Sequence, residues 1–258
     1  MSWKALVPRV VKVRMNTDFK VGPAKTEDAV QWWAKDHYVG FKSMRALRWA
    51  GVNWIKWSYE KFPDAYFAPA DDIVTLFKEM TAAGIVPSLS ATSRVIEGGC
   101  NLGRNLWAIR QAFQCDVTGM DISPTAIQTA REKIWTKLDR TNFILDNVLT
   151  SKWFDTVPDQ HFDLAFTRWH LIHIPRSPEK ARYLENLKRV SKVFVILEPV
   201  SAERAGTIQS QMDGQICHSW DRWGLDYDLT EYQPRTQLEN TSVFYSKPKP
   251  PSKPKPPR

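Results

Sequence analysis

The chain is short of cysteine and of long apolar runs, and both shortages limit what it can be. Its 3 cysteines, Cys100, Cys115 and Cys217, form no C-x-x-C pair, so the sequence predicts neither a disulfide framework nor a zinc site or other metal centre. No uninterrupted apolar run approaches the ~18 residues of a membrane span. The first residues also lack the apolar core of a signal peptide. We therefore expect a cytoplasmic protein that works away from the membrane.

Acidic residues are missing from one end of the chain, and this shapes the overall charge. The formal net charge is +8, but residues 247–258 contribute five positive charges and no negative one, which leaves +3 for the rest. The basic balance is therefore largely a property of this segment, and nucleic acid is not the expected partner. The lysine and proline density of 247–258 predicts a disordered or polyproline II tail.

The rest of the chain divides into two regions by composition. Residues 1–90 are rich in tryptophan and tyrosine and read as a helical cap or lid, whose last helix would be capped by Asp71 or Asp72 and stopped by Gly84. Residues 91–246 alternate short apolar strands with amphipathic helices. This alternation predicts a doubly wound, mainly parallel α/β sheet.

Glycine is scarce overall but concentrated after the first strand of the second region. The chain has 11 glycines, and three of them, Gly98, Gly99 and Gly103, fall within six residues. A strand, a glycine turn and a helix start place backbone N–H groups at one edge of a sheet, where a ligand is held. Glu97 closes the strand, and its carboxylate suits a cationic group such as an α-amino group or a sulfonium better than a pyrophosphate.

Polar side chains also follow the next three predicted strands. Asp121 ends the second strand, where an acid can accept both hydroxyls of a ribose. Asp146 and Asn147 end the third, where a carboxylate and a backbone N–H can recognise the edge of an adenine. The segment 167–175 follows the fourth strand and would face whatever lies beside that ligand.

These motifs resemble those of class I S-adenosylmethionine-dependent methyltransferases of the small-molecule type, over roughly residues 91–200. Residues 97–103 resemble the first motif of that family, 119–123 its acidic ribose motif, 145–148 its adenine motif and 162–167 its fourth motif. The resemblance implies a Rossmann-like sheet of seven strands with a reversed final strand, methyl transfer, and release of S-adenosylhomocysteine. The residues that it assigns to S-adenosylmethionine are Glu97, Gly98, Gly99, Cys100, Asn101, Gly103, Asp121, Ile122, Asp146, Asn147, Val148 and Thr167.

Two departures from the family pattern stand out. Asn101 replaces the middle glycine that the first motif often has, and we interpret it as a local variant of an intact site. The fourth motif is followed by Arg168, Trp169 and His170, without the Asn/Asp-Pro-Pro-Tyr/Phe sequence of enzymes that methylate DNA bases or glutamine side chains.

The residues around the methyl acceptor are less specified by the sequence. His170 and His173 are the candidate general bases, since histidine titrates near neutrality, although His173 lies among apolar residues and equally suits a structural role. Trp33 and Tyr38 are candidate lid residues. Arg168 and Trp169 are candidate substrate contacts, and Arg168 suits either an anionic substrate or a local acid.

The sequence thus predicts methyl transfer to an oxygen or nitrogen of a small molecule, such as a natural product or a sugar-like compound. Two alternatives stay open at this point. One is an enzyme that modifies RNA, protein or a peptide, favoured by the basic tail. The other is a protein that binds the cofactor without chemistry. Nothing in the sequence specifies an oligomeric state.

Overall fold

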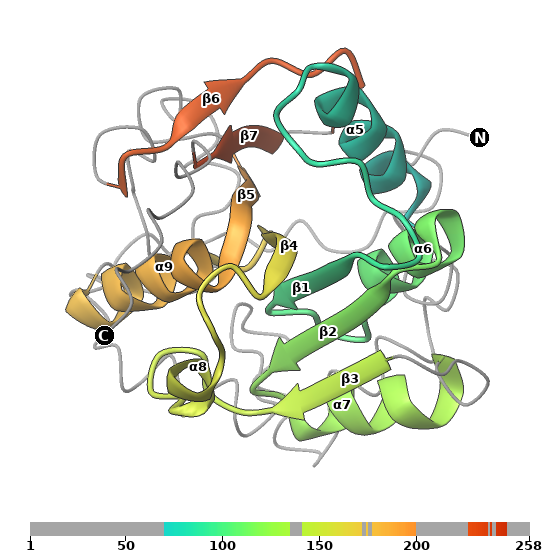
Figure 1. Cartoon of the computed structure of the whole chain (residues 1–258). Helices are drawn as coiled ribbons and strands as arrows, with labels where there is room; N and C mark the ends of the chain where they lie inside the picture. The colour runs from blue at the N-terminus through green and yellow to red at the C-terminus, as the bar shows by residue number, and fades with distance from the viewer. Residues whose placement is uncertain are drawn as a thin grey trace, which may run out of the picture.

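A single twisted sheet with helices on both faces makes up the described part of the chain (Figure 1). The computed structural model describes residues 70–134, 141–171, 174, 177–199, 227–236, 238 and 241–246. The proposed lid residues Trp33 and Tyr38, the histidine His173 and the tail 247–258 lie outside these ranges. The helices are α5 Asp71–Ala82, α6 Arg104–Phe113, α7 Pro124–Thr129, the π-helix η2 Ala130–Ile134, α8 Trp153–Thr156 and α9 Pro178–Val190. The strands are β1 Arg94–Gly98, β2 Asp116–Asp121, β3 Thr141–Leu145, β4 Phe162–Arg168, β5 Ser191–Pro199, β6 Thr230–Tyr232 and β7 Thr241–Tyr245.

The sheet has seven strands in the order β3-β2-β1-β4-β5-β7-β6. Strands β1 to β5 pair in parallel, whereas β7 runs antiparallel to both of its neighbours. The predicted doubly wound α/β class, with seven strands and a reversed last strand, is therefore confirmed. The three-residue strand β6 was not predicted, because a segment so short carries no measurable alternation of apolar and polar residues.

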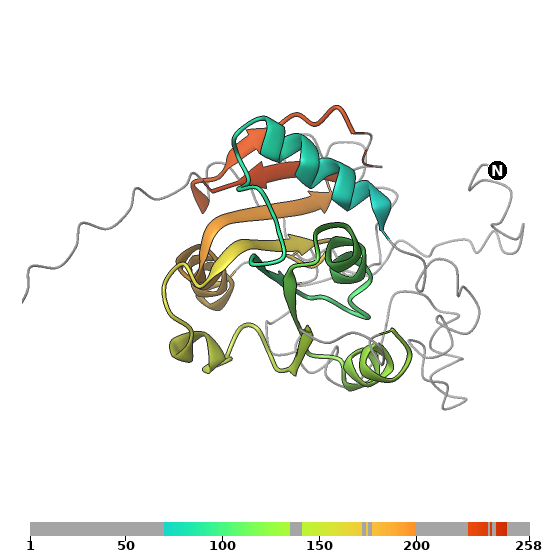
Figure 2. The ribbon, with the colours of Figure 1, turned by 45° about the vertical axis from the view of Figure 1, so that its right-hand side comes forward.

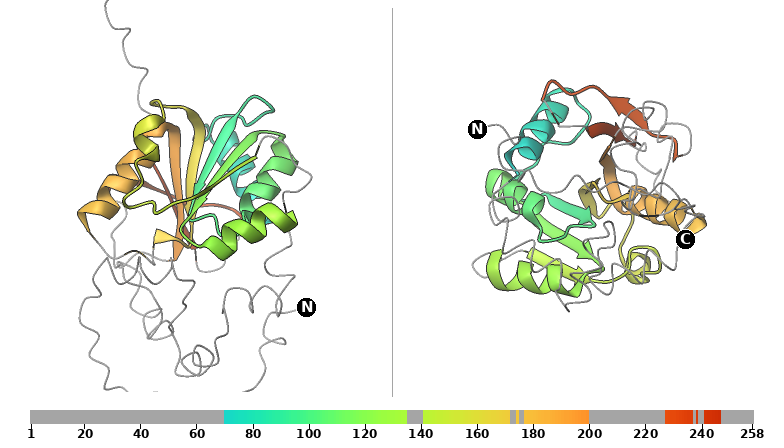
Figure 3. Two further views of the ribbon diagram at one scale, coloured as in Figure 1. Left: turned by 90° about the horizontal axis from the view of Figure 1, so that it is seen from below. Right: turned by 180° about the vertical axis from the view of Figure 1, so that it is seen from behind.

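Alternate residues of the central strands supply two hydrophobic cores, one on each face of the sheet. Val95 of β1 and Val195 of β5 belong to the core formed with α5, α6 and α7. Ile96 and Ile196, their neighbours in sequence, belong to the core formed with α8 and α9. Figure 3 shows the two groups of helices on opposite sides of the sheet. Burial on both faces of the sheet explains why residues 193–197 of β5 form a continuous apolar run.

Helix α5 packs into the same core as the sheet, although the sequence division places it with the N-terminal region. Its residues Ile73, Leu76 and Phe77 are fully buried, and Figure 2 shows the helix beside β7 and β6. Glu79 holds it there by accepting four hydrogen bonds from the end of β6 and the segment after it. The predicted aspartate cap of α5 is wrong, because Ala70 occupies the N-cap and both aspartates fall in the first turn.

Two other helix starts follow the sequence closely. Ser123 caps α7 by accepting from the Ala126 N–H, and Ser177 caps α9 by accepting from the Lys180 N–H, each followed by a proline at the first helical position. These caps end the loops that leave β2 and β4, and so determine where those loops run. None of the described helices is long and apolar enough to cross a membrane.

Candidate functional site

The carboxyl ends of β1, β2, β3 and β4 meet at one edge of the sheet, because these strands are parallel neighbours. The chain leaves β1 toward β2 on one side, while β4 and β5 lie on the other. The turn after β1 is therefore at the topological switch point, where open α/β sheets bind ligands.

The turn after β1 needs left-handed backbone at three positions. Gly99 has φ 72°, Asn101 φ 49° and Gly103 φ 73°. Asparagine is among the few residues other than glycine that adopt this conformation readily, so Asn101 keeps the turn geometry where the resemblance expects a glycine. The turn is fixed by the N–H groups of Gly99 and Cys100, which donate to the Met120 carbonyl at 2.8 and 3.1 Å.

Two glycines of the turn are required by the protein's own side chains. A Cβ atom at Gly98 would lie 1.8 Å from the Tyr183 hydroxyl oxygen, and one at Gly99 would lie 2.1 Å from the His170 ring. The close approach that the glycine cluster predicts is thus made by Tyr183 and His170 in this structure. His170 and Tyr183 also pack edge to face, with ring centroids 5.9 Å apart.

Glu97 is buried at the end of β1 with one oxygen available to a ligand. Its Oε1 accepts a hydrogen bond of 2.6 Å from the Asn105 side chain, and its Oε2 has no partner among the residues that the structure describes. Burial raises the pKa of this carboxyl to about 8, against the opposing effects of Asn105 and Arg168. A cation that reaches Oε2 would favour the ionised form, so the site fits a ligand ammonium group.

Asp121 stands at the end of β2 and connects two loops of the edge. Its Oδ2 accepts from the Asn101 N–H at 2.8 Å, and its Oδ1 accepts from the Ser123 N–H at 2.9 Å. A carboxylate oxygen can accept more than one hydrogen bond, and hydroxyls are suitable donors. Asp121 therefore fits the ribose role that the sequence assigns to it, while it also fixes the turn.

The end of β3 presents polar and apolar groups together. The Asp146 carboxylate accepts from the Asn147 N–H at 2.7 Å and from the Ser151 hydroxyl at 2.5 Å. Leu145 is 48 % exposed. Within the described ranges, Trp169 is the other large hydrophobic residue that is exposed. Ile122 is partly exposed and Val148 is buried. An exposed leucine beside Asp146 is a surface on which a flat ring can lie.

The segment after β4 is held by two buried charged residues that sequence reasoning missed. Glu198 of β5 accepts from the N–H groups of His170 and Leu171, both at 3.0 Å. Lys180 of α9 donates to the carbonyls of Leu171 and Ile174 at 2.8 and 3.0 Å. Thr167 is fully buried and donates to Glu198, so in this structure its side chain serves the loop and is not presented at the edge.

Arg168 is engaged by an acid of the protein itself. Both of its terminal nitrogens donate to the Asp72 carboxylate at the start of α5, and one also reaches the Asn105 side-chain oxygen at 3.4 Å. Burial alone would raise the pKa of Asp72, but the hydrogen bond and the charge of Arg168 outweigh it and lower the pKa. Asn105 therefore joins Arg168 to Glu97 and orients the carboxyl of the site.

Trp169 lies at the same edge and is 40 % exposed. Its backbone has φ 52°, which is unusual for a bulky residue, and its indole N–H donates to the Thr241 hydroxyl at 2.9 Å. Strained backbone of this kind concentrates at functional sites.

The Cys100 thiol is buried in the turn, and burial raises its pKa well above the ordinary value. A thiol that stays protonated is a poor nucleophile. Asn105, Tyr183, Glu198 and Lys180 carried no motif that could have revealed them. Only the buried polar positions of an amphipathic pattern would have pointed to them, and Lys180 and Tyr183 are such positions on α9.

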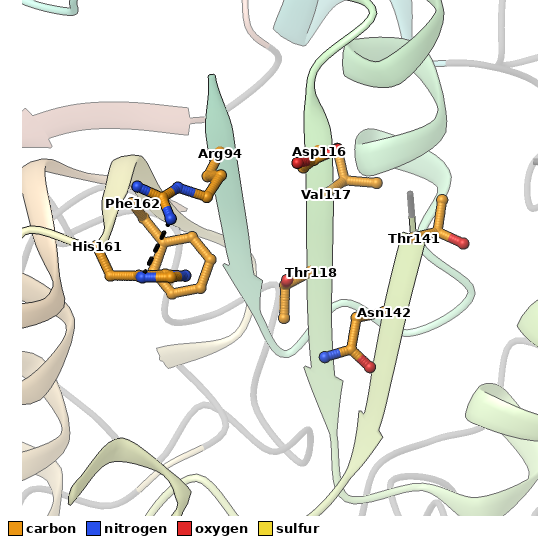
Figure 4. Close-up of a pocket in the computed structure, with 8 residues that line it drawn as sticks. All are labelled: Arg94, Asp116, Val117, Thr118, Thr141, Asn142, His161 and Phe162. Carbon is orange, nitrogen blue, oxygen red and sulfur yellow. Dashed lines mark hydrogen bonds between the residues drawn. The ribbon is translucent and has the colours of Figure 1, made fainter. Parts of the chain in front are cut away.

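A pocket of about 360 Å³ opens at the opposite, amino edge of β1, β2 and β3 (Figure 4). The Arg94 guanidinium lies 3.3 Å from the His161 ring nitrogen, and Asp116 and Asn142 also line the pocket. None of the sequence-predicted site residues lines it. No group of three or more potential metal ligands occurs in the described ranges.

Comparison with known proteins finds a sequence match over the parallel part of the sheet. Residues 95–193 match the sequence profile of a family described as a methyltransferase domain. A search of curated protein sequences found no match.

Solved structures share the fold at low sequence identity. A protein from Pyrococcus horikoshii is 15 % identical with a TM-score of 0.53, over 74 % of this chain and 98 % of that one. Phosphoethanolamine N-methyltransferase 2 from Haemonchus contortus, solved with S-adenosyl-L-methionine, is 14 % identical with a TM-score of 0.51, over 67 % of this chain and 39 % of that one.

Proposed function

We propose that the chain is a class I S-adenosylmethionine-dependent methyltransferase, which the profile match over residues 95–193 supports, and that it methylates an oxygen or nitrogen atom of a small-molecule acceptor. The proposal that the cofactor is S-adenosylmethionine rests on Glu97. This buried carboxyl lies beside the left-handed glycine turn, and its Oε2 has no hydrogen-bond partner among the described residues. A buried polar atom without a partner is costly, and a ligand that supplies the partner removes that cost.

We assign the methionine end of the cofactor to the end of β1, and its adenosine end to the ends of β2 and β3. Glu97 would accept from its α-ammonium group, and Asp121 from the ribose hydroxyls. Asp146, with Asn147, would meet the polar edge of the adenine, while the exposed Leu145 would contact its face. Ile122 lies between the ribose and adenine positions in sequence and completes this assignment.

When bound, S-adenosylmethionine supplies a methyl group that is already activated as part of a sulfonium. The protein therefore has to orient the acceptor and exclude water more than it has to activate the methyl group. Trp169 is exposed at this edge, and its backbone N–H donates to the Leu197 carbonyl while its indole N–H donates to Thr241. It therefore offers a fixed aromatic surface against which an acceptor can pack. His170 lies against the turn, where it would take the proton of an acceptor hydroxyl or ammonium. His173 stays a proposal from the sequence alone, as do the lid residues Trp33 and Tyr38.

A small-molecule acceptor is favoured over a macromolecule by the charge distribution. The excess positive charge lies mainly in the tail 247–258, away from the motif residues in sequence. Two cations directly follow site motifs in sequence: Arg168 is paired with Asp72, and Arg104 lies near the carboxylates of Asp72 and Asp71. The edge thus offers no free row of cations to a phosphate backbone among the residues described.

The test is formation of S-adenosylhomocysteine with a panel of small amines and alcohols, phosphoethanolamine included, compared with RNA and peptide acceptors. We expect turnover with a small acceptor by the wild type. Asp121→Ala should weaken cofactor binding in calorimetry by about 1–3 kcal/mol, because the ribose loses its acceptor. Asp155→Ala, an exposed aspartate of α8, is the control and should bind as the wild type does.

Wild-type affinity in Asp121→Ala would overturn the ribose assignment. Cofactor binding without product from any acceptor would favour a binding protein without chemistry, and turnover confined to RNA or peptides would overturn the small-molecule proposal.

A further inference from the structure

The hydroxyl of Tyr183 is buried behind the glycine turn and has no hydrogen-bond partner among the described residues. Tyr183 belongs to α9, and its ring packs against Phe154 and edge to face against His170. Burial, together with the nearby carboxylates of Glu198 and Asp121, raises the pKa of the phenol well above its ordinary value. The group therefore stays protonated and presents a hydrogen-bond donor.

This hydroxyl and the Glu97 carboxyl lie on opposite faces of the end of β1. The side chain of Ile96 belongs to the same core as Tyr183, and a Cβ at Gly98 would point at the hydroxyl from 1.8 Å. Glu97 falls between these two residues, so its side chain projects to the other face, where Asn105 of α6 binds it. One strand end thus separates a buried acceptor from a buried donor, each with an unpartnered atom in the part of the chain described.

An acceptor and a donor so placed match the two charges of an α-amino acid. We propose that Tyr183 is a cofactor-contacting residue, whose hydroxyl donates to the carboxylate of the methionine end of S-adenosylmethionine while Glu97 accepts from its ammonium group. This inference rests on the proposed function, since it extends the same site to a second face of β1.

Access to the hydroxyl runs past His170. The His170 ring contacts Tyr183 and also lies against Gly99, so it is the side chain that a ligand would displace. The bond that ties His170 to Glu198 comes from its backbone N–H, at 3.0 Å, and does not involve the ring.

Two ligands that differ only in the carboxylate test the proposal. Calorimetry measures the affinities of S-adenosylmethionine and of decarboxylated S-adenosylmethionine for the wild type, Tyr183→Phe and Glu97→Gln. Tyr183→Phe should weaken binding of S-adenosylmethionine by about 10- to 100-fold, because a hydrogen bond to a charged group is lost. It should change the affinity for the decarboxylated ligand by less than about 2-fold. Glu97→Gln should weaken both ligands, since both keep the amine.

Melting temperature separates a ligand contact from a structural role. Tyr183→Phe removes a hydroxyl without a partner in the described structure, so its melting temperature should equal or exceed that of the wild type. The control is Tyr232→Phe, whose hydroxyl donates to Glu79 at 3.0 Å, and which should melt lower and bind as the wild type does.

Three results would overturn the inference: unchanged affinity in Tyr183→Phe, an equal loss for both ligands, or a lowered melting temperature with unchanged binding. Absence of cofactor binding by the wild type would instead overturn the proposed function, and this inference with it.

Discussion

Glu97 is the residue where the site and the stability of the fold are most directly linked. Its pKa of about 8 lies above the ordinary value of 4.5, because the carboxyl is buried. Between these values the folded protein holds a proton that the unfolded chain has lost. Stability should therefore fall as pH rises from about 4.5 to about 8, by at most about 1.4 kcal/mol per pH unit from this group.

Urea unfolding at pH 5.5 and pH 8 measures this effect. We expect Glu97→Gln to lose less stability between the two pH values than the wild type, because glutamine does not titrate. Glu132→Gln, an exposed glutamate bound only to Gln128 in the described contacts, is the control and should keep the wild-type dependence. An identical pH dependence in Glu97→Gln would contradict the buried, protonated state.

The positions of several of these residues were predictable from sequence, and those of others were not. Glu97, Asp121 and Asp146 were found because strand ends are visible as the ends of apolar runs, and parallel strands bring those ends together. Asn105 and Tyr183 reach the turn from helices 8 and 85 residues beyond Glu97 and Gly98. Such contacts depend on how helices pack, which no local pattern records. The bonds by which Glu198 and Lys180 hold the segment after β4 are likewise long-range contacts that no local pattern records.

At the scale of elements, α9 contacts the end of β1 through Tyr183 and Gly98, and a pair of substitutions at these residues tests that contact. Gly98→Ala would put a Cβ 1.8 Å from the Tyr183 hydroxyl oxygen but 3.0 Å from the ring carbon that carries it. We expect a cost of about 1–3 kcal/mol in the wild-type background and a smaller cost in Tyr183→Phe. A double-mutant cycle by urea unfolding measures the difference.

Gly84→Ala provides the matched control for that cycle. Gly84 has φ 71°, and apart from the glycine and its chain neighbours no atom of the described residues lies within 4 Å of the position that a Cβ would take, so alanine there brings strain without a clash. Its cost should be the same in both backgrounds. Equal costs of Gly98→Ala in the two backgrounds would mean that Tyr183 is not the group that requires a glycine.

Helix α5 and strand β6 are connected through Glu79. Four donors from Tyr232, Arg235 and Thr236 reach its carboxylate, and the Arg235 N–H is the main cause that lowers its pKa to about 2. Because the folded pKa is depressed, this stabilisation is present above about pH 4.5 and is lost as pH falls toward 2. Glu79→Gln should lower the free energy of unfolding by about 1 kcal/mol at pH 7 and by less at pH 3. The same loss at both pH values in urea unfolding would contradict this.

Element boundaries followed from sequence where a local signal exists. Ser123 and Ser177 cap their helices, and each precedes a proline at the first helical position, a pattern that is visible in the sequence. The start of α5 was misassigned by one or two residues, because Asp71 and Asp72 suit a first helical turn as well as a cap. Strand β6 escaped prediction because it pairs with β7 through only three residues.

For the whole molecule, the described sheet is complete before the basic tail begins. Its last strand ends at Tyr245, and the Ser246 N–H still donates to the Phe194 carbonyl at 2.8 Å. Removal of residues 247–258 should therefore leave the melting temperature and cofactor affinity unchanged. Unchanged turnover would also leave the tail no part in substrate capture, whereas a loss of turnover at constant cofactor affinity would favour an acidic or macromolecular substrate.

The central claim is that the cofactor binds at the carboxyl edge of β1, β2 and β3. A crystal structure with S-adenosylhomocysteine tests it most directly. The account predicts the ligand ammonium within hydrogen-bond distance of Glu97 and the ribose hydroxyls at Asp121. A ligand bound instead in the pocket of Arg94, Asp116 and His161, at the opposite edge of the same strands, would contradict it.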